Sequence, residues 1–162
     1  MDNPEVALVQ WEEVNLWARA LSKWAQGQNF TDILAIQKGG LVPGVIISSE
    51  LGLPLHTLKA QRRKPPHTTL IIQDFWVKYP QAFYLVVDDI IDEGKTMINV
   101  AKMLSIQKAK FRTVSMLYKS HSKYKPDYYV TSVKSDSLVV FPWENEKKEL
   151  QQWREWNERH TE

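Results

Sequence analysis

The segment VVDDIIDEGKT, residues 86–96, holds the side chains that are best suited to chemistry in this chain. Asp88 and Asp89 directly follow an apolar run, residues 83–87, that is typical of a buried strand. Neighbouring carboxylates repel each other, and burial of an unpaired carboxylate costs free energy. Acids at such a point are therefore expected to meet a cation or a ligand that is rich in hydroxyl groups.

The next residues, 92–96, indicate a turn that contains Gly94 and leads into a helix. Backbone N–H groups at a helix start lack intrahelical partners, and with the Lys95 ammonium and the Thr96 hydroxyl they form a cradle for phosphate. The whole segment therefore suits a sugar phosphate. Its acids would face the ribose hydroxyls and a metal ion, and its amides would face the phosphate.

The tail Gly94-Lys95-Thr96 also invites comparison with the P-loop of nucleoside triphosphate-binding proteins. That motif requires another glycine five positions before the glycine that precedes the lysine. Asp89 occupies this position, so the P-loop interpretation is excluded.

Strands and helices are expected to alternate through the middle of the chain, which predicts an α/β fold with a central, mostly parallel sheet flanked by helices. Apolar runs predict strands at 33–36, 55–58, 69–76, 83–87, 111–118 and 128–133, and residues 138–141 form a further short apolar segment. Helices are expected at 11–26, 42–51, 96–106 and 144–158. Ligands of such sheets bind beyond the carboxyl ends of the strands, where segments 37–40 and 88–96 are expected.

Composition describes one ordinary globular domain, residues 1–162. The formal net charge of +2 favours neither nucleic acid nor a membrane surface as a partner. Absence of cysteine excludes disulfides, thiolate zinc sites and cysteine nucleophiles, and it fits a reducing cytoplasm. The acidic start lacks the pattern of a signal peptide, and no apolar run approaches the roughly 18 residues of a membrane span. We therefore expect a cytoplasmic protein.

Three segments resemble a known family. VVDDIIDEGKT resembles the phosphoribosyl pyrophosphate motif of type I phosphoribosyltransferases, and ILAIQKGGLVPGVIISSELGLPL, residues 33–55, resembles their pyrophosphate loop and the helix behind it. LVVFPWE, residues 138–144, is similar to the purine-binding end of short 6-oxopurine enzymes, such as bacterial xanthine-guanine and archaeal hypoxanthine-guanine phosphoribosyltransferases. The similarity covers about residues 16–144.

The resemblance implies a type I phosphoribosyltransferase fold with a small hood, formed by the N-terminal and C-terminal segments. It implies an enzyme that joins guanine, hypoxanthine or xanthine to ribose C1 of phosphoribosyl pyrophosphate and releases pyrophosphate. Charge develops on the sugar and on the leaving group, so Mg²⁺ is the expected cofactor. A C-terminal stripe of Leu150, Trp153 and Trp156 suits a subunit contact, and we expect a homodimer or larger homo-oligomer.

The residues that would bind phosphoribosyl pyrophosphate are Lys38, Gly39, Asp88, Asp89, Asp92, Glu93, Gly94, Lys95 and Thr96. By position, Asp88 and Asp89 would hold the ribose hydroxyls, partly through magnesium. Asp92 would lie near purine N7 as the catalytic general base or proton partner. Residues 93–96 would bind the 5′-phosphate, and Lys38 with Gly39 would bind pyrophosphate in a loop where the family often has a cis peptide bond.

At the base end, Lys119 matches the lysine that donates to the purine 6-oxo group, and the backbone of Val139 would read the base edge. Leu138 would give apolar contact with the base. Glu144 occupies roughly the place of an acid that reaches a second magnesium ion. The basic loop 59–68 lies near the family's mobile catalytic loop, and its charged residues Arg62, Arg63 and Lys64 would help to cover the pyrophosphate.

Two departures from the family pattern keep alternatives open. Glu93 stands where threonine or serine is usual, and Leu138 stands where an aromatic ring usually stacks on the purine. Both favour a non-catalytic regulator that binds phosphoribosyl pyrophosphate or a nucleotide with the same fold. Against it, no DNA-binding helix pair fits outside the core, and Asp92 is retained. A further alternative is an enzyme that uses a pyrimidine or another base.

Overall fold

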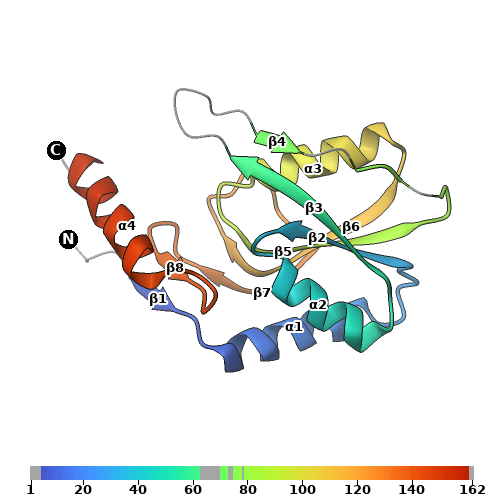
Figure 1. Cartoon of the computed structure of the whole chain (residues 1–162), viewed down its shortest axis with the longest axis horizontal. Helices are drawn as coiled ribbons and strands as arrows, with labels where there is room; N and C mark the ends of the chain where they lie inside the picture. The colour runs from blue at the N-terminus through green and yellow to red at the C-terminus, as the bar shows by residue number, and fades with distance from the viewer. Residues whose placement is uncertain (1–4, 63–69, 73–74, 78, 161–162) are drawn as a thin grey trace.

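A six-stranded sheet forms the centre of the computed structural model, which describes residues 5–62, 70–72, 75–77 and 79–160 (Figure 1). Its strand order is β4-β3-β2-β5-β6-β7. The strands are β2 (Asp32–Gln37), β3 (Leu55–Arg62), β4 (Leu70–Ile72), β5 (Phe83–Ile91), β6 (Lys110–Lys119) and β7 (Tyr128–Val133). Only the β3–β4 pair is antiparallel among these described strands, which confirms the mostly parallel sheet.

Helices cover both faces of this sheet (Figure 1). Helices α1 (Trp11–Ala25) and α2 (Leu41–Leu51) lie on one face, and α3 (Lys95–Ile106) lies on the other. Alternate residues of β5 serve the two layers: Leu85 and Val87 pack in the cluster with α1 and α2, whereas Tyr84 and Val86 pack in the cluster with α3. The buried run of β5 therefore contacts the apolar layers on both faces of the sheet.

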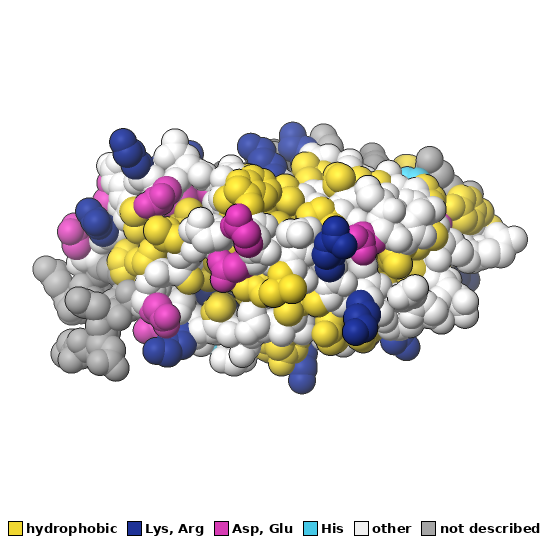
Figure 2. All heavy atoms as spheres, turned by 90° about the horizontal axis from the view of Figure 1, so that it is seen from below, with side chains coloured by type: hydrophobic (Ala, Val, Ile, Leu, Met, Phe, Trp, Pro, Cys, Tyr) yellow, Lys and Arg dark blue, Asp and Glu magenta, His cyan; other side chains and the backbone are white. Residues whose placement is uncertain are grey.

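The two ends of the chain meet beside the sheet. Strand β1 (Val6–Leu8) pairs in parallel with β8 (Leu138–Val140), and α4 (Glu146–His160) continues from β8 and projects away from the sheet (Figure 1). Trp143 stacks on Phe141, with ring centroids 4.7 Å apart, and holds the chain between β8 and α4. Figure 2 shows the side of α1 and α2, where acidic and basic side chains are interspersed among apolar ones.

Two boundaries predicted for the segment 55–76 are wrong. The segment predicted as an exposed loop, 59–68, begins as strand, because β3 continues to Arg62 and its backbone pairs with β4. The rest of this segment, with Arg63 and Lys64, lies outside the described residues. The strand predicted at 69–76 is short, since β4 ends at Ile72 and residues 75–76 form no strand. Within the described part of the chain, no helix combines the length and apolar character that a membrane crossing requires.

A buried carboxylate, that of Asp32, accepts several hydrogen bonds at the amino end of the sheet. Segment 88–96 lies at the opposite end. Asp32, at the start of β2, is fully buried and interacts with His56 Nε2 at 2.6 Å. The Tyr79 hydroxyl donates to its two oxygens at 2.8 and 2.7 Å, and the Thr31 hydroxyl donates at 2.7 Å. Burial alone would raise the pKa of Asp32, but the hydrogen bonds from Thr31, Tyr79 and His56 outweigh it and the pKa lies below its usual value.

The substitution Asp32→Asn is expected to lower the free energy of unfolding at pH 7 by about 3 kcal/mol, because buried donors lose a charged acceptor. The lowered folded-state pKa means that the ionised carboxylate stabilises the fold above the unfolded-state pKa of about 3.9. This contribution disappears as the pH falls through the folded-state pKa. Urea unfolding between pH 7 and pH 3 measures both effects.

The matched control is Asp136→Asn, which changes an exposed carboxylate and should alter the free energy of unfolding by less than about 0.5 kcal/mol. A gap between wild type and Asp32→Asn that stays constant down to pH 3 would contradict the assigned role of the Asp32 carboxylate.

Candidate functional site

The paired acids lie inside a strand. The sequence predicts that the strand ends at Val87, but β5 continues to Ile91 because its last residues pair with β6, with Asp88 opposite Ser115. Asp88 is 9% exposed and Asp89 is 8% exposed. Backbone N–H groups donate to both carboxylates: Asp89 N lies 3.0 Å from Asp88 Oδ1, and Ile90 N lies 2.7 Å from Asp89 Oδ1.

Within the described part of the chain, neither of these two carboxylates pairs with a cation. Burial, followed by the charge of Asp89, raises the pKa of Asp88 well above its usual value. Burial also raises the pKa of Asp89, against the opposing backbone hydrogen bond from Ile90. Arrival of a cation would remove both the repulsion and the penalty of burial, so the pair is built for a cation or a hydroxyl-rich ligand.

Chemistry of the donor set fits Mg²⁺. Carboxylate oxygens are hard ligands, and Mg²⁺ is usually held by one or two carboxylates together with substrate phosphates and water. The described residues contain no cluster of three or more histidine, aspartate or glutamate side chains that would hold a metal by themselves. Asp88 and Asp89 can therefore hold this ion only together with oxygens of a ligand or of water.

The loop after β2 packs directly against the acids, because β2 and β5 are neighbours in the sheet. A Cβ atom added at Gly39 would collide with the carboxylate of Asp89, and one at Gly40 would collide with the carbonyl oxygen of Val87. The peptide bond between Gln37 and Lys38 is cis, as the family resemblance implied. Lys38 is exposed at this loop. The structure thus brings Gly39 to the acid pair, and Lys38 is the exposed residue before it.

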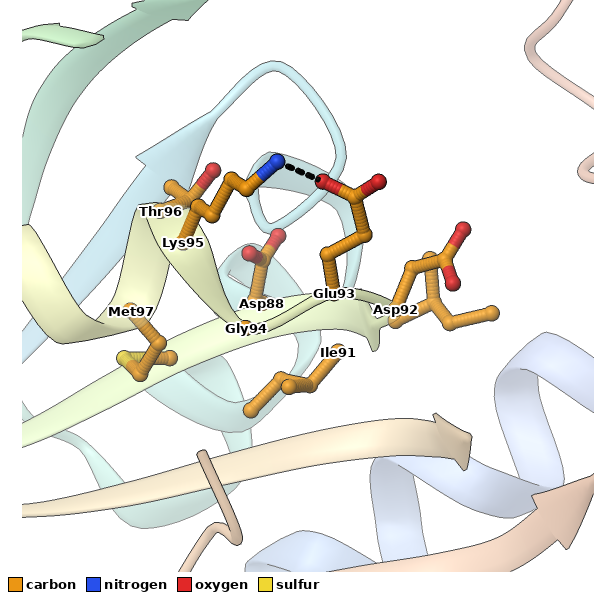
Figure 3. Close-up of a pocket in the computed structure, with 9 residues that line it drawn as sticks. Asp88, Ile91, Asp92, Glu93, Gly94, Lys95, Thr96 and Met97 are labelled. Atoms are coloured by element: carbon orange, nitrogen blue, oxygen red, sulfur yellow. Dashed lines mark ion pairs between the residues drawn. The ribbon is translucent and has the colours of Figure 1, made fainter. Parts of the chain in front are cut away.

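The turn before α3 frames a small cavity (Figure 3). Gly94 has φ of +80° and caps α3, which begins at Lys95, one residue earlier than expected. The cavity encloses about 160 Å³, less than the roughly 300–1,000 Å³ of a whole small-molecule site. It is lined by Asp88, Ile90, Ile91, Asp92, Glu93, Gly94, Lys95, Thr96 and Met97. Its size and the start of α3 suit one phosphate group.

Glu93 and Lys95 neutralise each other at the rim of this cavity. Lys95 Nζ lies 2.7 Å from Glu93 Oε2, and the two side chains are 50% and 44% exposed. Figure 3 shows them reaching toward each other above Asp88. The negative charge of Glu93, which stands where the family usually has threonine or serine, is therefore paired locally with Lys95.

Asp92 lies beside two nitrogen-bearing side chains from the end of β6. Lys119 Nζ donates to its Oδ2 at 3.2 Å, and His121 Nε2 lies 3.2 Å from its Oδ1. Lys119 is buried, with 8% of its surface exposed, whereas the side chain of Asp92 is 51% exposed. Sequence reasoning assigned no role to His121. Its position two residues after Lys119, beyond the strand next to β5, is the signal that could have found it.

Three residues predicted at the base end, Leu138, Val139 and Glu144, lie in β8 or after it. Leu138 and Val139 are half-buried in β8. Glu144 Oε2 accepts a hydrogen bond from Phe141 N at 2.8 Å. Partial desolvation, with the charges of Asp89 and Glu149, raises the pKa of Glu144. The backbone of Arg62 belongs to β3, while Arg63 and Lys64 lie outside the described residues.

Comparison with known proteins gives one consistent result. The family model described as phosphoribosyl transferase domain matches residues 8–152. The xanthine-guanine phosphoribosyltransferase of Gluconobacter oxydans is 32% identical over 146 residues, which cover 85% of this chain and 84% of that protein. The corresponding protein of Cereibacter sphaeroides is 30% identical over 154 residues, with 84% and 85% covered.

Solved structures agree. The purine phosphoribosyltransferase from Pyrococcus horikoshii superposes with a TM-score of 0.78 at 26% identity, covering 86% of this chain and 95% of that one. The xanthine-guanine-hypoxanthine phosphoribosyltransferase of Helicobacter pylori shares the fold, with a TM-score of 0.78 at 22% identity and 91% and 99% of the chains covered. The sequence match over residues 8–152 and these relatives show that the chain belongs to the phosphoribosyl transferase domain family.

Proposed function

We propose that this protein is a purine salvage phosphoribosyltransferase. It transfers 5-phosphoribose from phosphoribosyl pyrophosphate to guanine, hypoxanthine or xanthine and releases pyrophosphate. One observation carries the proposal: the buried pair Asp88–Asp89 lies between the Gly39 loop and the cavity at the start of α3. Names of the matched relatives support the purine acceptor.

In this proposal the chain binds the donor along the carboxyl ends of β2 and β5. The N–H groups at the start of α3, with the Thr96 hydroxyl, hold the 5′-phosphate in the cavity. Lys38 and the backbone at Gly39 bind the pyrophosphate end. The carboxylates of Asp88 and Asp89 accept hydrogen bonds from the ribose hydroxyls and hold Mg²⁺. When bound, the ion offsets the negative charge that develops on the leaving pyrophosphate.

The acceptor base lies between the end of β6 and β8. Lys119 donates to the 6-oxo group, and Asp92 takes a proton from the base as the bond to ribose C1 forms. The backbone of Val139 reads the base edge, and Leu138 supplies apolar contact. Glu144 would contribute to a second magnesium site, as the family resemblance implies. The small sheet of β1 and β8, with α4, serves as the hood.

We further propose that the protein acts in the cytoplasm as a homodimer or larger homo-oligomer. The absence of cysteine supports the compartment. Helix α4 projects from the body with Leu150 and Trp153 half-buried, which supports a subunit contact along that helix.

The alternative of a non-catalytic regulator loses one of its two supports. Glu93 favoured it because a negative charge weakens phosphate binding, yet the Glu93 carboxylate is paired with Lys95 at 2.7 Å. An incoming phosphate therefore meets a neutralised pair, and it can compete for the Lys95 ammonium. We retain the catalytic assignment.

Incubation with phosphoribosyl pyrophosphate, Mg²⁺ and each of a panel of bases tests the function directly. Guanine, hypoxanthine or xanthine should yield the nucleotide and one equivalent of pyrophosphate, and chelation of Mg²⁺ should abolish turnover. Binding of phosphoribosyl pyrophosphate without formation of a nucleotide, even at high enzyme concentration, would favour the alternative of a non-catalytic regulator. Product with only a pyrimidine or another base would overturn the purine assignment.

The variant Asp92→Asn should lower kcat by about 10²- to 10⁴-fold, because a positioned proton acceptor is typically worth that much. The KM for phosphoribosyl pyrophosphate should change by less than about threefold, since the other donor-binding residues remain in place. Steady-state kinetics at saturating base separate the two parameters. Turnover near that of wild type would remove Asp92 from the chemical step.

The variant Gly39→Ala should lower kcat/KM for phosphoribosyl pyrophosphate by about 100-fold, because its methyl group displaces the Asp89 carboxylate. Gly27→Ala is the control: Gly27 has φ of +78° and no neighbour within 4 Å of an added Cβ, so this variant loses stability without touching the site. Initial rates, with thermal unfolding of both variants, make the comparison. Equal kcat/KM values in the two variants would contradict the close packing of Gly39 on Asp89.

A further inference from the structure

We propose that His121 is a positioning residue that holds the carboxylate of Asp92 in the orientation needed for proton transfer. The proposal rests on the proposed function, which makes Asp92 the proton acceptor. It concerns a residue that the family motif does not contain and that the sequence pattern left without a role.

The two oxygens of Asp92 have different partners. Lys119 Nζ contacts Oδ2 and His121 Nε2 contacts Oδ1, each at 3.2 Å. A carboxylate held at one oxygen only can still rotate about its Cα–Cβ and Cβ–Cγ bonds, and contact at both oxygens restricts both torsions. Since the side chain of Asp92 is 51% exposed, packing alone does not fix it. The pair of contacts therefore sets the direction of its lone pairs.

His121 lies in a turn that packs against the loop 92–96. Lys123 N donates to the carbonyl oxygen of Glu93 at 3.2 Å, and Ser122 N donates to that of Lys119 at 3.0 Å. A Cβ at Gly94 would lie 2.6 Å from Ser122 Oγ and 2.7 Å from Tyr124 N, so the absence of a side chain lets the turn approach. The position of His121 relative to Asp92 is thus set by contacts on Glu93 and Gly94, the two residues that follow Asp92.

The division of work between the two partners explains why a second one is needed. Lys119 is proposed to donate to the purine 6-oxo group. One of its three N–H groups must therefore stay available for the base. No such second task is proposed for His121, whose Nε2 lies 3.2 Å from Asp92 Oδ1. This second contact leaves Lys119 free to serve the base while Asp92 stays in place.

The contact between His121 and Asp92 is expected to contribute little to the stability of the fold. His121 and Asp92 are 38% and 51% exposed, and exposed pairs of this kind contribute little to the free energy of folding. A substitution at His121 is therefore expected to change catalysis much more than the free energy of unfolding. This difference separates a positioning role from a structural one.

The experiment compares His121→Ala, His121→Gln and the control Ser120→Ala, which alters an exposed neighbour in the same turn. His121→Ala should lower kcat by about 10- to 100-fold, because misplacement of a reacting group by about 1 Å has this cost. The KM for phosphoribosyl pyrophosphate should stay within about twofold. His121→Gln retains an N–H donor and should restore kcat to within about threefold of wild type, and Ser120→Ala should match wild type.

A double-mutant cycle with Asp92→Asn makes the dependence explicit. In that background His121→Ala should lower kcat by less than about twofold, because no carboxylate remains to be oriented. A kcat for His121→Ala within twofold of wild type, or an equal loss in both backgrounds, would overturn the proposal.

A measurement without turnover separates this proposal from the proposed function. Three-bond Hα–Hβ couplings of Asp92 report its χ1 rotamer. They should indicate a single rotamer in wild type and His121→Gln, and averaging in His121→Ala. Averaged couplings in wild type would refute the positioning role even if the enzyme is active. A single rotamer with no nucleotide from any base would instead refute the proposed function.

Discussion

Repulsion between two adjacent buried carboxylates is the constraint on which the site depends. Asp88 and Asp89 lie in β5, a strand paired with β2 on one side and β6 on the other, so the backbone cannot move them apart. The described residues supply backbone N–H donors to them but no cation. The fold itself maintains this unfavourable pair, and a bound cation or a polyhydroxylated ligand relieves it. That is the physical sense in which the pocket is prepared for an activated sugar.

Close packing of backbone against the acids makes the arrangement possible. The loop after β2 reaches Asp89 through a glycine, at a point where even a methyl group would overlap the carboxylate. Two loops that are about fifty residues apart in sequence therefore share one surface, and its groups are carboxylates, backbone amides and the exposed Lys38. A ligand that carries phosphates at both ends of a ribose matches this order of groups.

The charged side chains of the loop 92–96 are paired locally with groups of opposite charge. Glu93 is paired with Lys95, and Asp92 is paired with Lys119 and His121. Each pair is at least partly exposed, so its contribution to stability is small and its charges remain available to a ligand. The stability of the fold comes from elsewhere, from the apolar layers on both faces of the sheet and from the Asp32 cluster at its amino end.

Local sequence was sufficient for the order of the helices and of the central strands, though not for β1, and it located segment 88–96 at a strand-to-helix junction. Apolar periodicity and the residues at such a junction are local properties. Tertiary structure alone decided that β5 carries its acids inside the strand, that β3 continues into the predicted loop, and that Gly39 meets Asp89. It also decided that His121 meets Asp92 and that His56 and Tyr79 meet Asp32. These features join segments that are far apart in the chain, and they follow from strand order and register. Hydrophobic periodicity carries no information about either, because it reports which face of an element is buried and not which element lies beside it.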